Sequence, residues 1–278
     1  MRDVSKAAPG PVWASPTVVG LGASAGGLEP LAQFLARVPP DSGLAFVVVQ
    51  HLDPTHKALL AELLQRSTAM PVREVSGPTP VEADHVYVIP PAAEITLTGG
   101  ALHLAKPSRP RGQRLSIDVM FSSLARELGE RAIGVVLSGM GADGSAGLQA
   151  IKARGGLTLA QLPTSAQFDD MPRSAIAAGC VDIIDLPGEL PARILAAAAQ
   201  ARLPAAAAGA ATGDDAAALD RILVLLHAHT RRDLALYKSN TLQRRVARRV
   251  AVQGLGSMAS YADFLRGNPQ ELDLLFNC

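Results

Sequence analysis

Three residue types that together hydrolyse esters occur in separate short blocks of this chain. Ser24 lies in the run GASAGG at residues 22–27, His51 follows an apolar segment, and Asp143 lies in the run SGMGADG at residues 138–144. A serine hydroxyl is a weak nucleophile until a neighbouring imidazole takes its proton. A carboxylate then holds that imidazole in the required tautomer and stabilises its charged form. The three blocks therefore predict a triad of Ser24, His51 and Asp143.

The glycine-rich turn at Ser24 fits two kinds of site. Gly22-x-Ser24-x-Gly26 is typical of a nucleophile elbow, whereas Gly20-x-Gly22-x-x-Ala25 is a weak dinucleotide-binding fingerprint. A dinucleotide site needs an acidic residue at the end of the second strand to hold the ribose. Here His51 stands at that place, which favours the nucleophile over the nucleotide. A turn of small residues taken alone is also compatible with simple tight packing.

The segments that must position the triad alternate between strand-like and helix-like patterns. Apolar strands are predicted at 18–21, 44–49 and 133–137, and each ends just before one of the three blocks. Further strands are predicted at 72–75, 85–89, 157–160 and 181–184, a hairpin at 94–97 and 101–104, and helices at 28–35, 53–68, 117–128, 146–153, 171 onward and 191–202. This alternation predicts an α/β fold, a doubly wound and mostly parallel sheet with an antiparallel hairpin. Ligands bind beyond the carboxyl ends of such strands, so the three blocks should meet at one edge.

The two turns also offer backbone donors for an oxyanion. We expect the N–H groups of Ala25 and of the Met140–Gly141 turn to stabilise the negative oxygen of a tetrahedral intermediate. Met140 is interpreted as a residue that lines the site.

Composition limits the remaining classes of function. The chain has 278 residues, 48% hydrophobic and 18% charged, with a net charge of +1, so no global charge favours nucleic acid or a membrane. Its first residues contain no apolar core of a signal peptide, and the two cysteines form no metal spacing or disulfide framework. We therefore expect a cytoplasmic protein with a short disordered leader.

Several other polar groups have simpler explanations. His51, Asp53 and His56 match no strong zinc spacing, so no metal is predicted, and Asp53-Pro54 is typical of a helix start. Ser116 is a candidate N-cap for the helix after it. Asp143, taken alone, could cap the helix that follows it, and Asp169 and Asp170 fit a solvated loop.

These blocks resemble the active-site blocks of chemotaxis protein-glutamate methylesterases, the CheB family. The resemblance runs over about residues 15–195 and includes VGLGASAGG from residue 19, Gln50-His51 and LSGMGADG from residue 137, with Ser116-Ile117-Asp118 and Met171-Pro172-Arg173 as further matching positions. It implies that Ser24 is the nucleophile, His51 the general base and Asp143 its orienting acid. It also implies hydrolysis of glutamyl methyl esters on chemoreceptor helices, with no cofactor. Family members often carry Thr where this chain has Ala25.

After the last strand the pattern becomes entirely helical. Residues 204–218 are rich in Ala, Gly and Asp and predict a linker between a catalytic domain at 15–203 and a second unit at 219–278, with helices near 219–229, 240–252, 258–266 and 270–276. The run YKSNTLQRRVARR from residue 237 resembles the helical N-terminal domain of chemoreceptor methyltransferases, the CheR family. That family's cofactor-binding domain has no counterpart here, so S-adenosylmethionine binding is not predicted.

The arginines of this run have two interpretations. On sequence alone Arg244, Arg245, Arg248 and Arg249 fit a solvated helix face, whereas the CheR resemblance implies a docking surface for acidic receptor helices. Nucleic acid is a poor partner for them because no aromatic platform accompanies them. The alternative to an esterase is a degenerate module that binds receptors or partners without turnover.

Overall fold

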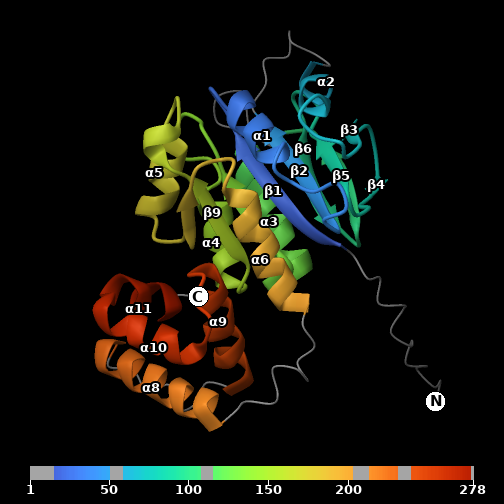
Figure 1. The fold of residues 1–278 in the computed structure, drawn as a ribbon. Coiled ribbons are helices and arrows are strands. Elements are labelled where there is room, and N and C mark those ends of the chain that lie inside the picture. Colours follow the sequence, from blue (N-terminus) through green and yellow to red (C-terminus); the bar gives the residue numbers. More distant parts are fainter. Residues whose placement is uncertain (1–15, 51–58, 108–114, 203–212, 231–238, 277–278) are drawn as a thin grey trace, which may run out of the picture.

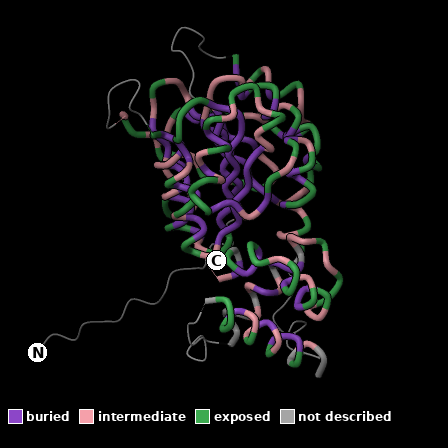
Figure 2. Tube along the Cα trace, turned by 90° about the vertical axis from the view of Figure 1, so that its left-hand side faces the viewer, coloured by how far each residue is buried: buried purple, intermediate pink, exposed green. Residues whose placement is uncertain are grey.

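The structure is a computed structural model that describes residues 16–50, 59–107, 115–202, 213–230 and 239–276. It consists of a sheet-containing body and a smaller helical unit, which lies below that body in Figure 1. Figure 2 shows that buried residues fill the interior of the first and form a separate, smaller group in the second. The predicted helix start at Asp53-Pro54 lies outside the described residues.

The main sheet has seven parallel strands in the order β10-β9-β8-β1-β2-β5-β3. Their bounds are β1 (Thr17–Ala23), β2 (Leu44–Gln50), β3 (Val72–Glu74), β5 (His85–Val88), β8 (Ile133–Val136), β9 (Leu157–Gln161) and β10 (Ile183–Asp185). The central strands are apolar along their whole length because helices cover both faces of the sheet. The predicted doubly wound parallel fold is confirmed.

The predicted hairpin belongs to a second, small antiparallel sheet. Its strands are β4 (Thr79–Pro80), β6 (Glu94–Thr98) and β7 (Ala101–Ala105), in the order β4-β7-β6. Gly99 and Gly100 form the two-residue turn with φ values of 59° and 77°, which suits glycine and matches the twist of a tight hairpin. The pattern analysis did not predict β4, which has only two residues.

Alternate residues of the strands serve two separate apolar layers. Val19 and Leu21 pack with α1 (Leu28–Leu35), α2 (Leu59–Gln65) and α6 (Leu190–Arg202). Val18 belongs to the opposite layer, with α3 (Ser116–Leu128), α4 (Ser145–Ala153) and α5 (Asp170–Ala177). Two short 3-10 turns lie at η1 (Gly129–Arg131) and η2 (Pro163–Ser165). This alternation follows from the two-residue period of a strand.

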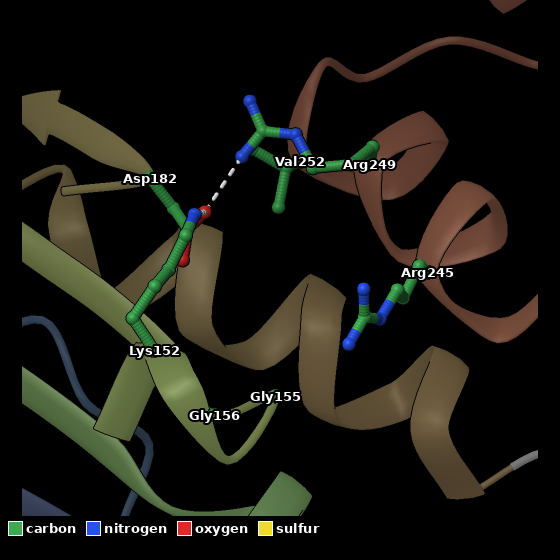
Figure 3. A pocket seen from close by; sticks show the side chains of 7 residues that line it. All are labelled: Lys152, Gly155, Gly156, Asp182, Arg245, Arg249 and Val252. Atoms are coloured by element: carbon green, nitrogen blue, oxygen red, sulfur yellow. Dashed lines mark hydrogen bonds and ion pairs between the residues drawn. The ribbon is translucent and has the colours of Figure 1, made fainter. Parts of the chain in front are cut away.

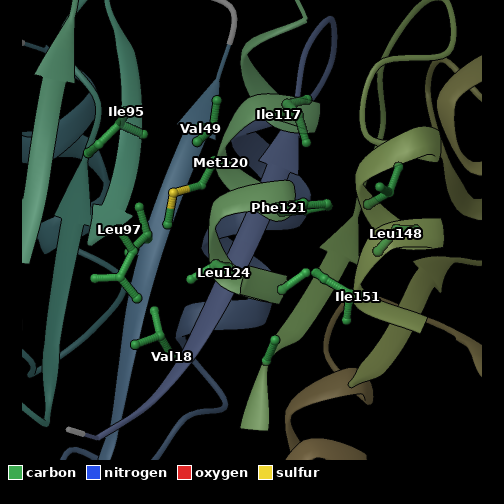
Figure 4. Packing of buried hydrophobic residues seen from close by; sticks show 14 of the residues in the cluster. Val18, Val49, Ile95, Leu97, Ile117, Met120, Phe121, Leu124, Leu148 and Ile151 are labelled. Atoms are coloured by element: carbon green, nitrogen blue, oxygen red, sulfur yellow. The ribbon is translucent and has the colours of Figure 1, made fainter. Parts of the chain in front are cut away.

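Helix α3 lies directly over β1 and explains two of the glycines near Ser24. Its apolar residues Ile117, Phe121 and Leu124 recur at the spacing of one helix face and are buried, as Figure 4 shows. A Cβ atom at Gly20 would lie 2.7 Å from the Phe121 ring, and one at Gly22 would lie 2.4 Å from Ile117 Cγ2. The glycines of the weak dinucleotide fingerprint are therefore required by helix packing, which removes the main reason for a nucleotide site.

The helical unit has its own hydrophobic core. It contains α8 (Gly213–Thr230), α9 (Ser239–Val252), α10 (Met258–Gly267) and α11 (Pro269–Phe276), and its buried residues include Ile222, Val246, Tyr261 and Leu265. The four predicted helices are confirmed. Helix α8 begins at Gly213, so the last part of the predicted 204–218 linker is helical, and residues 203–212 lie outside the described ranges. Within those ranges we find no helix with the length and apolar character needed to cross a bilayer.

Candidate active site

The strand order brings the three predicted blocks to neighbouring strands. Strand β1 lies between β8 and β2, and Ala23, the last residue of β1, is paired with Gln50, the last residue of β2. Ser24 and the 138–144 turn therefore lie at the same carboxyl edge of the sheet. His51 directly follows Gln50 but lies outside the described residues, so its part in the triad stays a prediction.

Ser24 is half-buried on a turn that is held on both sides. Its N–H donates to Ser138 O at 3.0 Å, and its carbonyl accepts from Gly27 N at 3.0 Å. Gly26 has a φ of +67° and a Cβ there would lie 2.7 Å from Gln167 Oε1, so this position suits only glycine. Helix α1 then begins at Leu28. The turn fixes the backbone on either side of Ser24.

The 138–141 turn approaches Ser24 closely because residue 139 has no side chain. A Cβ at Gly139 would lie 2.0 Å from Met171 Sδ and 2.9 Å from Ser24 Cβ. Gly139 N–H also donates to Phe168 O at 2.9 Å, and Met171 N–H donates to Gly139 O at 3.0 Å. Glycine thus permits three segments, from β1, β8 and the start of α5, to meet around the serine.

A buried hydroxyl at Ser138 connects these three segments, a role that the sequence analysis did not assign. The Ser138 hydroxyl is placed to donate to Ala25 O at 2.9 Å and to Phe168 O at 3.3 Å. Its oxygen accepts from Phe168 N–H at 3.1 Å. Ser138 N–H donates to Gln161 Oε1 at 2.9 Å, and Gln161 Nε2 donates to Ser165 O at 3.1 Å. The available signal in the sequence was a hydroxyl placed two residues after the end of the buried strand β8.

The predicted oxyanion donors differ in their surroundings. Within the described residues, the N–H groups of Ala25 and Met140 have no hydrogen-bond acceptor. Gly141 N–H instead faces Asp170 Oδ2 at 3.5 Å, so Gly141 is the weaker candidate. The Met140 side chain is 59% exposed, in keeping with a residue that lines an open site.

Asp143 is 4% exposed, and its carboxylate receives the first N–H groups of α3. Ile117 N–H donates to Oδ2 at 3.1 Å, and Asp118 N–H donates to Oδ1 at 3.0 Å. A carboxylate at a helix N-terminus satisfies unpaired donors and complements the helix dipole. The predicted cap, Ser116, is instead the first helical residue and makes no cap hydrogen bond. Asp143 therefore caps a helix remote in sequence, and not the helix that follows it.

Asp118 makes the reciprocal contact. Its Oδ1 accepts from Gly144 N at 3.0 Å and Gly147 N at 2.7 Å, at the start of α4. Burial raises the pKa of Asp118, and the Asp143 carboxylate also raises it, while the backbone hydrogen bonds oppose the shift. The two helix starts are thus locked together beside the site by exchanged carboxylates.

Two large apolar side chains extend from this edge. The Phe168 side chain is 37% exposed. Phe168 lies near Met140 because Phe168 O accepts a hydrogen bond from the N–H of Gly139, the residue before Met140. The neighbouring acidic residues lie at the start of a helix and not in the predicted solvated loop, because Asp170 is the first residue of α5. Asp169 is paired to Arg173 at 2.6 Å. Exposed apolar groups next to Ser24 suit the apolar part of a ligand.

The predicted arginine surface is partly wrong. Arg249 is 1% exposed, and its guanidinium is bound by Glu271 and Asp182 at 2.7 Å and 2.8 Å. A long cationic side chain is buried when carboxylates satisfy its donors, and this removes Arg249 from any open docking surface. Arg245 lines a pocket beside it, and the side chains of Arg244 and Arg248 lie outside what the structure describes.

The three residues that we considered as metal ligands cannot be placed in the structure. His51, Asp53 and His56 are outside the described residues. In the ranges that are described, no group of three or more His, Cys, Asp or Glu side chains could hold a metal ion.

The fold is a doubly wound α/β fold, and Ser24 and the 138–144 turn lie at the carboxyl edge of its parallel sheet. The family model described as CheB methylesterase matches residues 19–194, and the chain belongs to this family. A second model, described as CheR methyltransferase, all-alpha domain, matches residues 217–278. Both matches agree with the two resemblances seen in the sequence.

Individual relatives agree with the family. A protein-glutamate methylesterase/protein-glutamine glutaminase of Thiobacillus denitrificans is 35% identical over 66% of this chain and 53% of its own length. An uncharacterized 104.1 kDa protein of Rhodobacter capsulatus is 39% identical over 77% of this chain and 24% of its own length. The crystal structure of the Thermotoga maritima CheB methylesterase catalytic domain matches with a TM-score of 0.61 and 25% identity, over 65% of this chain and 98% of that one. The chain thus spans about half the length of the Thiobacillus denitrificans methylesterase and about a quarter of the Rhodobacter capsulatus protein.

Proposed function

We propose that this chain is a serine esterase that hydrolyses glutamyl methyl esters on the cytoplasmic helices of chemoreceptors, in chemotaxis-type adaptation. The observation that carries the proposal is the Ser24 turn. It places a half-buried hydroxyl beside the side-chain-free Gly139, with two N–H groups that lack acceptors among the described residues, those of Ala25 and Met140. Family membership and the names of the relatives support the same activity.

The proposed reaction has two steps. Ser24 Oγ attacks the ester carbonyl carbon while His51 takes the hydroxyl proton. The oxyanion is stabilised by the N–H groups of Ala25 and Met140. The intermediate collapses as the C–O bond to methanol breaks, and His51 returns its proton to the leaving oxygen. Water then attacks the acyl-serine with His51 as base, which frees the glutamate and restores Ser24.

Asp143 has two proposed tasks in this scheme. As the orienting acid it would hold His51 in the tautomer whose free nitrogen faces Ser24. The same carboxylate accepts the Ile117 and Asp118 N–H groups, so its position is set by the start of α3. We propose that this anchoring holds the carboxylate still while His51 gains and loses a proton.

The substrate is proposed to lie along the apolar rim of the edge. Met140 and Phe168 would contact the methyl ester and the apolar side of the receptor helix, because both are exposed there. Receptor docking by the helical unit is proposed for Arg244, Arg245 and Arg248 of α9, and the buried Arg249 is left out of it. We propose a cytoplasmic location because the proposed substrate lies on the cytoplasmic helices of receptors. No nucleic acid, cofactor or membrane insertion is part of the proposal.

The test is release of methanol from methylated receptor cytoplasmic fragments. Wild-type protein should release methanol, Ser24→Ala should release none, and Ser260→Ala, at an exposed serine of the helical unit, should match wild type. Receptor affinity, measured separately, should hardly change in Ser24→Ala because only transition-state chemistry is removed. Tight receptor binding by the wild type without methanol release would instead favour the binding module.

Deamidation is a second candidate reaction. Relatives carry the additional name protein-glutamine glutaminase, and the same acyl-serine forms when ammonia, and not methanol, leaves from a glutaminyl side chain. Ammonia release from a receptor fragment with glutamine at the modified positions tests this activity. It should be lost in Ser24→Ala together with methanol release if one nucleophile serves both substrates.

A further inference from the structure

Four buried side chains of alternating charge connect the sheet-containing body to the helical unit. They are Lys152 at the end of α4, Asp182 just before β10, Arg249 on α9 and Glu271 on α11. Their side chains are 1% to 5% exposed. Lys152 and Asp182 form an ion pair, and Arg249 Nη1 lies 2.8 Å from Asp182 Oδ1. Figure 3 marks the contact between Arg249 and Asp182 with a dashed line.

Each unit contributes a pair that is complete in itself. In the body, Asp182 binds Lys152 and also accepts from the N–H of Thr158 at 3.1 Å and from its Oγ1 at 2.8 Å. In the helical unit, Glu271 holds Arg249 through two parallel bonds of 2.7 Å. Glu271 also accepts from Tyr261 OH at 2.7 Å. The Arg249–Asp182 hydrogen bond therefore joins two pairs that are already neutral.

An apolar contact accompanies this bond. Val252, at the end of α9, packs against the hydrophobic layer that contains α6, with Leu195, Ala197 and Ala198 of that helix in the same layer. Val252 also lines a pocket with Gly155 and Gly156 from the body. In Figure 3, Val252 and Arg249 come from the helical unit and face Asp182 and Lys152. Residues of both units thus form one small contact surface.

This contact lies at the end of the sheet away from Ser24. Gly155 and Gly156 precede β9, and Asp182 precedes β10, so the contact is at the amino edge of the parallel strands. Ser24 follows the carboxyl end of β1. Figure 1 shows the helical unit beneath the amino edge. The contact therefore does not cover the edge where the proposed chemistry occurs.

We infer that Lys152, Asp182 and the Gly155–Gly156 turn form a docking surface for the chain's own helical unit, and that this contact opens reversibly. Removing one partner of a buried ion pair is costly because the other charge is left uncompensated. Here separation of the units leaves Lys152 with Asp182 and Arg249 with Glu271, so no buried charge loses its last partner. The helical unit separates from the body as an intact unit. Separation changes the distance of the helical unit from the body and leaves the Ser24 turn unchanged.

The test uses a substitution that breaks the contact but removes neither ion pair. Val252→Lys places an ammonium group in a contact that Lys152, Arg245 and Arg249 already line, and in the full chain it should increase the radius of gyration measured by small-angle X-ray scattering. It should also raise hydrogen exchange in α6 and at residues 155–157. Val224→Lys is the matched control, since Val224 is 67% exposed on α8 of the same unit, and it should leave both readouts at wild-type values. Val252→Ala, which adds no charge, should give a smaller increase in exchange at the same positions.

Three results would overturn the inference. The first is wild-type scattering and exchange in Val252→Lys. The second is loss of the circular dichroism helix signal in Val252→Lys, which would mean that the units do not separate intact. The third is an equal change of scattering and exchange in Val252→Lys and Val224→Lys. Methanol release by Val252→Lys should equal that of wild type. A wild-type protein without esterase activity would refute the proposed function while leaving the scattering and exchange tests of docking unaffected.

Discussion

Replacing Asp143 by Asn tests the structural role of this carboxylate as well as its proposed catalytic one. Both oxygens accept backbone N–H groups, from Ile117 at 3.1 Å and from Asp118 at 3.0 Å. An Asn side chain has one acceptor oxygen, so its amide N–H₂ must face a second donor. The variant loses at least one charge-assisted hydrogen bond and the interaction of a negative charge with the start of α3. The structure therefore predicts a measurable loss of stability.

The magnitude follows from these contacts. A hydrogen bond to a charged group contributes about 1.5–3 kcal/mol, and the charge at the helix start adds about 0.3–1 kcal/mol. Asp118 loses a repulsive neighbour in the variant, because the Asp143 carboxylate raises the pKa of Asp118, and this relief offsets part of the loss. We expect the free energy of unfolding to fall by about 1–3 kcal/mol. For a domain of this size, about 2–4 °C in Tm accompanies each kcal/mol.

The assay has two parts. Urea unfolding followed by circular dichroism gives the stability of Asp143→Asn and of the control Asp170→Asn, whose exposed carboxylate only approaches Gly141 N at 3.5 Å and should change stability by less than about 0.5 kcal/mol. Methanol release is then measured where both variants are folded, and Asp143→Asn should lose about 10²–10⁴-fold in turnover. Wild-type stability of Asp143→Asn would refute the capping argument, and wild-type turnover would remove Asp143 from the mechanism.

Three further predictions concern the surroundings of the site. Ser138→Ala leaves buried partners of the hydroxyl unpaired and should lower the free energy of unfolding by about 1–3 kcal/mol, whereas Ser138→Thr keeps the hydroxyl and should lose less; equal urea midpoints would contradict this. Gly139→Ala puts a Cβ 2.0 Å from Met171 Sδ and should lower turnover at least 10-fold, which corresponds to a barrier increase of roughly 1.4 kcal/mol. The control Gly77→Ala adds its Cβ in open space and should match wild-type turnover. Burial raises the pKa of the Cys180 thiol from 9.0 to about 11. Because the folded state holds the proton more tightly than the unfolded state, the thiol contributes to the free energy of unfolding. This contribution is present below pH 9 and is lost as the pH rises through about 11. Wild type should therefore lose more stability than Cys180→Ala between pH 9 and 11 in urea unfolding, and parallel curves would show that the thiol does not titrate differently in the two states.

Much of the sheet was predictable because its signals are local. The apolar runs at β1, β2 and β8 and the small residues after them are visible in the chain. Since parallel strands carry their ligands at the carboxyl ends, these patterns predicted one edge for Ser24 and Asp143. The helical unit was equally visible from its periodic apolar residues. Its start at Gly213 was missed, because the alanine-rich stretch before it carries no apolar period.

The details of the site depended on contacts between distant segments. Ser138 and Ala25, which share a hydrogen bond, are separated by much of the domain, and Asp143 caps a helix that precedes it in the chain. No local pattern distinguishes a cap for one helix from a cap for another, because the same carboxylate satisfies either set of donors. The exchange of Asp143 and Asp118 between α3 and α4 therefore became visible only with the tertiary structure.

The sequence by itself determined the residue types available for chemistry, the glycine turns that present them, and the parallel strands that gather them at one edge. These properties follow from backbone sterics and short-range periodicity, which act between near neighbours. The tertiary structure alone decided that Arg249 is buried against Glu271 and Asp182, although its sequence pattern also fits an exposed basic face. The burial of a charge depends on whether remote carboxylates compensate its desolvation, and only packing of α9 against α11 and the amino edge of the sheet brings them together.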